Sequence, residues 1–151
     1  MYTVTQVKKK VSDYCVYQDR SHWEVEQKLK TFSFLNEEER GEVIVWLIEN
    51  DFLNEERFAR SYARGKFYQK KWGKIKIIQG LKQKRVSEKL ITEGLQEIDE
   101  EDYKQTLGKI AKRKWETITE ASVFIKKKKL VAYLLQKGYE SFLIYELLED
   151  F

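Results

Sequence analysis

Cationic side chains near the middle of the chain suggest ionic chemistry. Arg57, Arg60, Arg64 and Lys71 follow one another at intervals of three, four and seven residues, so on a continuous helix they share one face. An arginine guanidinium forms paired hydrogen bonds with carboxylate or phosphate, whereas lysine contributes a compact positive charge. The spacing therefore predicts a cationic stripe that binds an anionic partner.

Further basic residues follow this stripe, and Glu88 is the only acidic residue between Arg57 and Leu90. We expect a strong local positive field, although the formal net charge of the whole chain is only +4. An unpaired stripe costs a few tenths of a kcal/mol per neighbouring like-charge pair, so binding of DNA phosphate or of an acidic protein groove stands beside the alternative of a merely solvated helix face, and both stay open. The candidate binding residues are Arg57, Arg60, Arg64, Lys70, Lys71, Lys74, Lys76, Lys82, Lys84 and Arg85.

The arginines of the stripe are expected on an exposed helix face. Replacing Arg57, Arg60 and Arg64 together with glutamate should therefore spare folding while abolishing partner binding. Tyr68 and Trp72 lie in the same basic segment, where exposed rings could stack on single-stranded bases. Aromatic residues at helical spacing are more often packing residues, so both interpretations of these rings stay open.

A second group of basic residues lies nearer the carboxyl end. It comprises Lys109, Lys112, Arg113 and Lys114, followed by the run 126–129 of four lysines. Four consecutive lysines cannot share one face of a helix, so we interpret the run mainly as a source of solubility and long-range steering, with direct contact as the less favoured alternative.

Catalytic chemistry has few residues to draw on. His22 is the only histidine and Cys15 the only cysteine, which excludes an intrachain disulfide and disfavours thiolate or imidazole metal clusters. The sequence has no glycine-rich phosphate loop, and the acidic pairs 37–38 and 55–56 stand where helix amino termini normally collect acids. We expect no enzyme activity, no metal and no cofactor.

Signals for helix starts recur along the chain. Ser21 with Glu24, and Asn36 with Glu39, fit capping boxes, in which each side chain satisfies the other residue's free backbone N–H. Further caps are predicted at Asn54, Ser87 and Asp99, and a first helix over Val4–Asp19. With no proline and 36% charged residues, the composition predicts an all-α protein with almost no sheet.

The chain also repeats itself. Shifted by 53 positions, Leu81 falls on Leu134, and the match continues at Gln83/Gln136, Lys84/Lys137, Leu90/Leu143, Ile91/Ile144, Glu93/Glu146 and Leu95/Leu148. Such repetition predicts tandem three-helix (helix-turn-helix-like) repeats in an elongated, curved array that binds something long. We place the units at 1–50, 51–98 and 99–151, and expect Gly138 to end a helix in the left-handed conformation.

An ordered set of motifs resembles the RecX family of recombinase regulators. The segment FLNEERFAR (52–60), then KWG (71–73) and LKQKRVS (81–87), resembles the family's central region, and YLLQKGY (133–139) resembles its final repeat. The likeness covers roughly the last two-thirds of the chain well. The family usually has a proline and further arginines after the tryptophan–glycine pair, and a glycine where this chain has Arg85, which resists positive φ.

The resemblance implies a modulator of the RecA recombinase, affecting recombinational DNA repair and the SOS response. Such a protein docks on RecA filaments on DNA and alters, most often inhibits, ATP hydrolysis and strand exchange. We expect a cytoplasmic monomer with weak, non-specific DNA binding, and no membrane segment, because no apolar run approaches the roughly 20 residues that a spanning helix needs.

Two alternatives stay open. A helix-turn-helix transcriptional regulator would use the helices between Gly73 and Leu95, but the helix after Ser87 is poor in the arginine, asparagine and glutamine that read base edges best. A general single-strand binder would bind DNA tightly without any recombinase.

Overall fold

The computed structural model describes residues 3–151, and these contain helices and no strand. The elements are α1 (Val4–Tyr17), α2 (His22–Lys30), α3 (Glu37–Glu49), α4 (Glu55–Arg64), the π-helical segment η1 (Gly65–Gln69), α5 (Lys74–Gln83), α6 (Glu88–Leu95), α7 (Glu100–Thr117), α8 (Val123–Gln136) and α9 (Ser141–Leu148). The prediction of an all-α fold is confirmed.

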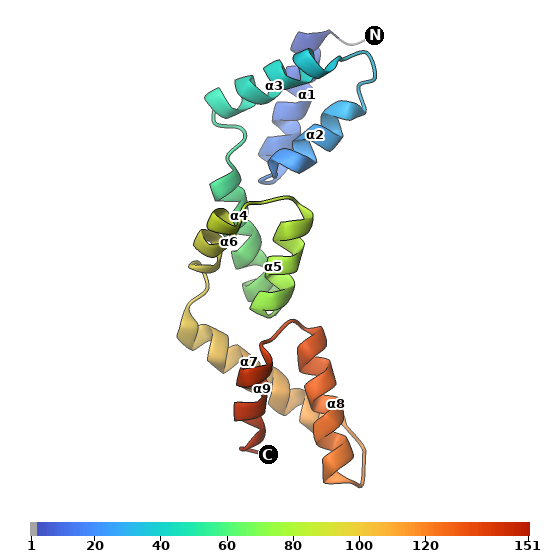
Figure 1. Ribbon diagram of the computed structural model, residues 1–151, viewed down its shortest axis with the longest axis vertical. Helices are drawn as coiled ribbons and strands as arrows, with labels where there is room; N and C mark the ends of the chain where they lie inside the picture. The colour runs from blue at the N-terminus through green and yellow to red at the C-terminus, as the bar shows by residue number, and fades with distance from the viewer. Residues whose placement is uncertain (1–2) are drawn as a thin grey trace.

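The helices form three groups of three that follow one another along the long axis of the molecule (Figure 1). We call α1–α3 the first unit, α4–α6 with η1 the second unit, and α7–α9 the third unit. The proposed boundaries after residues 50 and 98 fall in the loops between α3 and α4 and between α6 and α7. The array is elongated, with the amino terminus at one end and the carboxyl terminus in the unit at the other end.

Short-range hydrogen bonds fix the helix starts as the sequence predicts. The Ser21 hydroxyl accepts from the Glu24 N–H at 3.1 Å, and the Glu24 carboxylate accepts from the Ser21 N–H at 3.0 Å, which completes a capping box. A second box joins Asn36 and Glu39 in the same way. Side-chain caps are also present at Asn54, Ser87 and Asp99.

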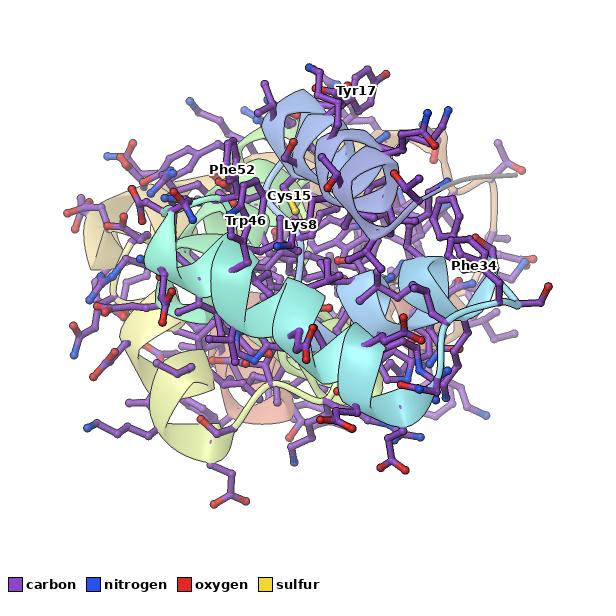
Figure 2. The ribbon with its side chains drawn as sticks, turned by 90° about the horizontal axis from the view of Figure 1, so that it is seen from above. Lys8, Cys15, Tyr17, Phe34, Trp46 and Phe52 are labelled. Carbon is purple, nitrogen blue, oxygen red and sulfur yellow. The ribbon has the colours of Figure 1, made fainter. Side chains whose placement is uncertain are left out.

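The first unit has its own apolar core. Its buried side chains come from all three helices and from the turn after α3: Val7, Val11, Cys15, Val25, Leu29, Leu35, Val43, Leu47 and Leu53. Trp46 stacks on Phe52 at 5.6 Å between ring centroids, and the Lys8 ammonium lies over the Trp46 ring (Figure 2). Tyr17 and Phe34 point away from this core.

The second and third units share one continuous core. It runs from Phe58 in α4 to Ile144 in α9. At its centre the rings of Phe67, Tyr103 and Tyr139 lie in series, with centroid separations of 5.5 Å and 5.3 Å. Burying such rings together is favourable by area and by ring geometry, so these two units are joined by apolar packing that does not extend into the first unit.

Candidate partner-binding surface

The predicted cationic stripe does not lie on one continuous helix. Helix α4 ends at Arg64, and the wider π-helical turn of η1 changes the phase of the residues that follow. Lys71 then adopts a left-handed backbone, with φ of 62°. The expectation that Lys71 extends the face of Arg57, Arg60 and Arg64 is therefore wrong, because both the π segment and the turn redirect its side chain.

Arg57 connects the second unit to the first. Its Nε donates to Asp19 Oδ1 at 2.9 Å, across the loop between α1 and α2. The same guanidinium bonds to Asp51 Oδ1 at 3.3 Å and to the carbonyl oxygens of Asp51 and Phe52 at 3.1 Å and 3.3 Å. Arg57 is thus an inter-unit contact rather than a free surface cation.

Arg60 and Arg64 are neutralised within the chain. Arg60 donates from Nε and a terminal nitrogen to Glu56 Oε1, each at 3.2 Å, and Arg64 pairs with Glu97. Glu97 lies in the loop before α7, beyond the segment in which the sequence shows almost no acid. The expectation of an unpaired stripe is wrong for these arginines. Replacing Arg57 with glutamate would place two carboxylates together at Asp19, so the triple substitution would also disturb the inter-unit contact.

The six candidate lysines and Arg85 lie in several different surroundings. Lys74 pairs with Glu100 and Lys84 with Glu24. Lys76 lies over the Trp72 ring, and Lys71 donates to the Tyr68 carbonyl at 3.3 Å. Among the candidates, the exposed cations that make no ion pair within residues 3–151 are Lys70, Lys71, Lys82 and Arg85.

The candidate aromatic side chains, Tyr68 and Trp72, already have partners within the protein. The Tyr68 hydroxyl donates to Asp102 at 2.8 Å and accepts from the Asp99 N–H at 3.3 Å. Trp72 is half-buried, and the ammonium groups of Lys66 and Lys76 lie 4.7 Å and 4.4 Å from its ring centroid. A nucleic-acid base that stacked on Trp72 would have to displace a lysine.

A cleft between the first and second units brings some candidates together. It encloses about 500 Å³ and is lined by Lys66, Lys70 and Lys84 with Asp19 and Glu24. Lys66 was missed in the sequence because it lies in the π-helical segment, where helical spacing no longer indicates which residues share a face. The mixed charges of the lining suit a polar partner surface.

Two different junctions join the three units. The first junction, between the first and second units, is held by side-chain contacts: the ion pairs Arg57–Asp19 at 2.9 Å and Lys84–Glu24 at 3.4 Å, and a polar contact of 3.4 Å between His22 Nδ1 and Glu55 Oε2. Each of these side chains is only partly buried, so each pair contributes up to about 1 kcal/mol and is weakened by salt.

The second junction, between the second and third units, is held by backbone hydrogen bonds. The Gly73 N–H donates to the Lys137 carbonyl at 2.7 Å, and the Ile75 N–H donates to the Gly138 carbonyl at 2.9 Å. The Tyr139 hydroxyl donates to the Lys71 carbonyl at 2.7 Å. These contacts border the shared apolar core, so the second and third units form the firmer pair.

Tyr103 completes the second junction. Its hydroxyl accepts from the Lys74 N–H at 2.9 Å and donates to the Glu140 carboxylate. Burial, and then the hydrogen bond to Glu140, raise the pKa of Tyr103, and burial likewise raises the pKa of Tyr139. Both phenols therefore stay neutral hydrogen-bond donors in the folded protein.

The described part of the chain shows neither a metal-binding cluster nor a membrane-spanning element. Within residues 3–151, no three histidine, cysteine, aspartate or glutamate side chains lie close enough together to hold an ion. None of the helices over the same residues combines the length and the apolar character that crossing a bilayer requires. The site that the geometry offers is a charged surface.

Comparison with known proteins gives the family. The family model described as RecX, second three-helix domain, matches residues 54–95, and the one described as RecX, third three-helix domain, matches residues 100–148. Curated proteins named Regulatory protein RecX are similar: that of Clostridium acetobutylicum is 32% identical over 131 residues, and that of Bacillus mycoides is 30% identical over 142 residues. These alignments cover 84% and 91% of this chain but only 60% and 50% of the relatives.

Solved structures agree on the fold. The crystal structure of RecX from Lactobacillus salivarius superposes with a TM-score of 0.86 at 23% identity, covering 97% of this chain and 95% of that one. A second crystal structure, of a regulatory protein RecX, also gives 0.86 at 24% identity and covers 98% of this chain and 73% of that one. With the two matched three-helix domains and the curated relatives, these observations place the chain in the RecX family of regulatory proteins.

Proposed function

We propose that this protein regulates the RecA recombinase by binding RecA filaments on DNA, and that it inhibits ATP hydrolysis and strand exchange. Its work would take place in the cytoplasm and would affect recombinational DNA repair and the SOS response. The observation that carries the proposal is the membership of an elongated three-unit array in the RecX family.

The shape of the molecule supports a long partner. Three units stacked end to end present a surface much longer than it is wide, as repeat arrays that bind extended partners do (Figure 1). The exposed cations Lys70, Lys82 and Arg85 lack ion pairs within the described residues and are available to carboxylates or phosphates of such a partner. Regulation by binding requires no chemistry beyond these contacts.

The helix-turn-helix alternative receives less support. Helix α6 packs closely on α4, since Gly94 lies against the Ala59 carbonyl, and its exposed positions include Glu88, Lys89 and Thr92. An acidic residue at the start of a recognition helix repels the phosphates beside the major groove. We keep sequence-specific DNA binding only as an outcome of the test.

The test measures ATP hydrolysis by RecA on single-stranded DNA while this protein is added at fixed salt. The proposal expects the rate to fall at protein concentrations well below those that saturate the DNA. The variant K70E/K82E should need about tenfold more protein for the same inhibition, which corresponds to about 1.4 kcal/mol of binding. The matched control K104E/K112E changes the charge equally at exposed positions of the third unit and should inhibit like the unchanged protein.

An unchanged hydrolysis rate at stoichiometric protein, with RecA from the same organism, would refute the proposal. A site-selection experiment that finds one DNA sequence preferred by about 10³-fold or more would instead support the transcriptional regulator. Equal losses in K70E/K82E and its control would show that net charge, rather than these lysines, drives binding.

A further inference from the structure

A cationic groove lies between α7 and α8, near the second junction. It encloses about 480 Å³, and its cationic lining consists of Lys71, Lys109, Arg113, Lys114 and Lys137. The remaining lining residues are uncharged. The groove therefore concentrates positive charge on both walls without an acidic residue among its lining.

These five cations differ from the arginines of α4. None of them forms an ion pair within residues 3–151, whereas Arg57, Arg60 and Arg64 all do. Lys114 lies over the Tyr133 ring at 4.6 Å, which leaves its charge uncompensated. Like charges gathered around one hollow repel one another, and an anion bound between them would relieve that repulsion.

The fold holds the groove in shape. Lys109 and Arg113 are four residues apart on α7, so their side chains share a face and are offset by about 6 Å along the helix. Lys137 is the C-cap of α8, and its carbonyl is fixed by the Gly73 N–H. The Lys71 carbonyl accepts from the Tyr139 hydroxyl, so the firm second junction sets the position of both lysines.

We propose that this groove binds the sugar–phosphate backbone of single-stranded nucleic acid. A single strand carries one negative charge at every nucleotide, so consecutive phosphates can meet cations on both walls. The half-buried side chains of Ile110 and Tyr133 give the groove an apolar floor against which a sugar or a base can pack. A flexible strand can enter a hollow of this volume, while a duplex is too wide and too stiff to follow it.

The inference rests on the proposed function only in naming where the single strand comes from, because a recombinase filament contains single-stranded DNA. It also assigns direct DNA contact to Lys109, Arg113 and Lys114, which the sequence analysis placed in a second basic group and not among the candidate binding residues. Four of its five cations belong to the third unit, so Lys109 and Arg113 can be replaced without changing Lys70 and Lys82 of the second unit.

The test uses the full chain without any recombinase. Binding of a fluorescently labelled oligothymidylate is measured by anisotropy at several salt concentrations. K109E/R113E should raise the Kd at least tenfold and reduce the slope of log K against log salt by about 1.4, since each phosphate contact on a single strand contributes about 0.7. K104E/K112E, with the same charge change on exposed positions of the same helix, should change the Kd by less than about threefold.

Several results would overturn the proposal that this groove binds single-stranded nucleic acid. These are equal losses in the two double variants, tighter binding of a duplex of the same length, or binding of polyglutamate in place of the oligonucleotide. Circular dichroism checks folding, and K109A/R113A replaces the glutamate variant if that one unfolds. If K109E/R113E binds the oligonucleotide normally while the protein still slows RecA, the groove is refuted and the proposed function stands. If the groove binds DNA and RecA is unaffected, the proposed function is refuted and the groove proposal stands.

Discussion

The two junctions of this protein join equivalent positions of neighbouring units, but the first uses side-chain contacts and the second uses backbone hydrogen bonds. At the first junction, Lys84, the C-cap of α5, reaches Glu24 in the first turn of α2. At the second, Lys137, the C-cap of α8, accepts from Gly73, the N-cap of α5. In both cases the turn before a unit's last helix meets the start of the middle helix in the preceding unit.

Other contacts correspond as well. Glu55, the first residue of α4, pairs with His22, and Glu100, the first residue of α7, pairs with Lys74. His22 and Lys74 are themselves the first residues of α2 and α5. The array therefore repeats its junctions as well as its helices.

Two glycines account for the difference. A Cβ on Gly73 would lie 2.2 Å from the Gly138 carbonyl carbon, and a Cβ on Gly138 would lie 2.3 Å from Lys76 Cβ. The first junction has Ser21 and Arg85 at the matching places, so its backbones cannot approach as closely. Side-chain ion pairs fill that space, and we expect the first unit to move relative to a firm pair formed by the second and third.

Gly138→Ala should produce the largest loss of stability among the substitutions that separate the two junctions. The added methyl would overlap Lys76, and alanine resists the φ of 96° found at Gly138. We expect a loss of about 3 kcal/mol in the free energy of unfolding, measured by urea denaturation.

The matched substitution is Arg85→Gly at the equivalent turn. Arg85 has φ of 60°, and glycine adopts this conformation without strain, so stability should stay the same or rise by up to about 1 kcal/mol. A similar loss in both variants would contradict the idea that only the second junction depends on close backbone approach.

Tyr103→Phe should have the next largest effect. The substitution removes the hydroxyl that joins the Lys74 N–H to Glu140, and leaves that N–H without its partner. We expect a loss of about 2 kcal/mol by urea denaturation. The equivalent residue in the second unit is Phe58, which follows its cap Asn54 by four residues just as Tyr103 follows Asp99. Phe58 has no hydroxyl, so the first junction already lacks this hydrogen bond. A loss below about 0.5 kcal/mol would show that the hydrogen bonds of the second junction contribute little.

Arg57→Met should have the smallest effect, confined to the first junction. We expect a loss of about 1 kcal/mol in local stability and therefore about fivefold faster labelling of Cys15 by a thiol reagent at pH 8. Burial raises the pKa of Cys15 to about 11, so the folded thiol is neutral and reacts only when the first unit opens.

Arg64→Met is the control for this substitution, because Arg64 pairs with Glu97 and not with the first unit. It should leave the labelling rate unchanged. The difference between the two variants should shrink in 1 M NaCl, where the Debye length falls to about 3 Å. Equal labelling rates for both variants at low salt would contradict the assignment of Arg57 to the junction.

The sequence predicted what depends on neighbours along the chain. The caps at Ser21 and Asn36 use hydrogen bonds between residues three positions apart in the sequence, so residue spacing alone indicates them. The 53-residue repeat matches Leu81 with Leu134, and both are fully buried. The sequence was misleading at Arg85, where arginine in place of the usual glycine argued against positive φ: Arg85 has φ of 60°, because the same helix-ending hydrogen bonds close its turn and the turn at Gly138.

The tertiary structure alone decided which charges meet. Arg57 bonds to Asp19 from 38 residues away, and Arg64 pairs with Glu97 from 33 residues away. These pairs depend on the angles between helices and units, which no local pattern encodes. Residue type and spacing thus determined the helices, the repeat and the family resemblance, while packing decided that the arginines of α4 stabilise the array and that unpaired positive charge gathers between α7 and α8.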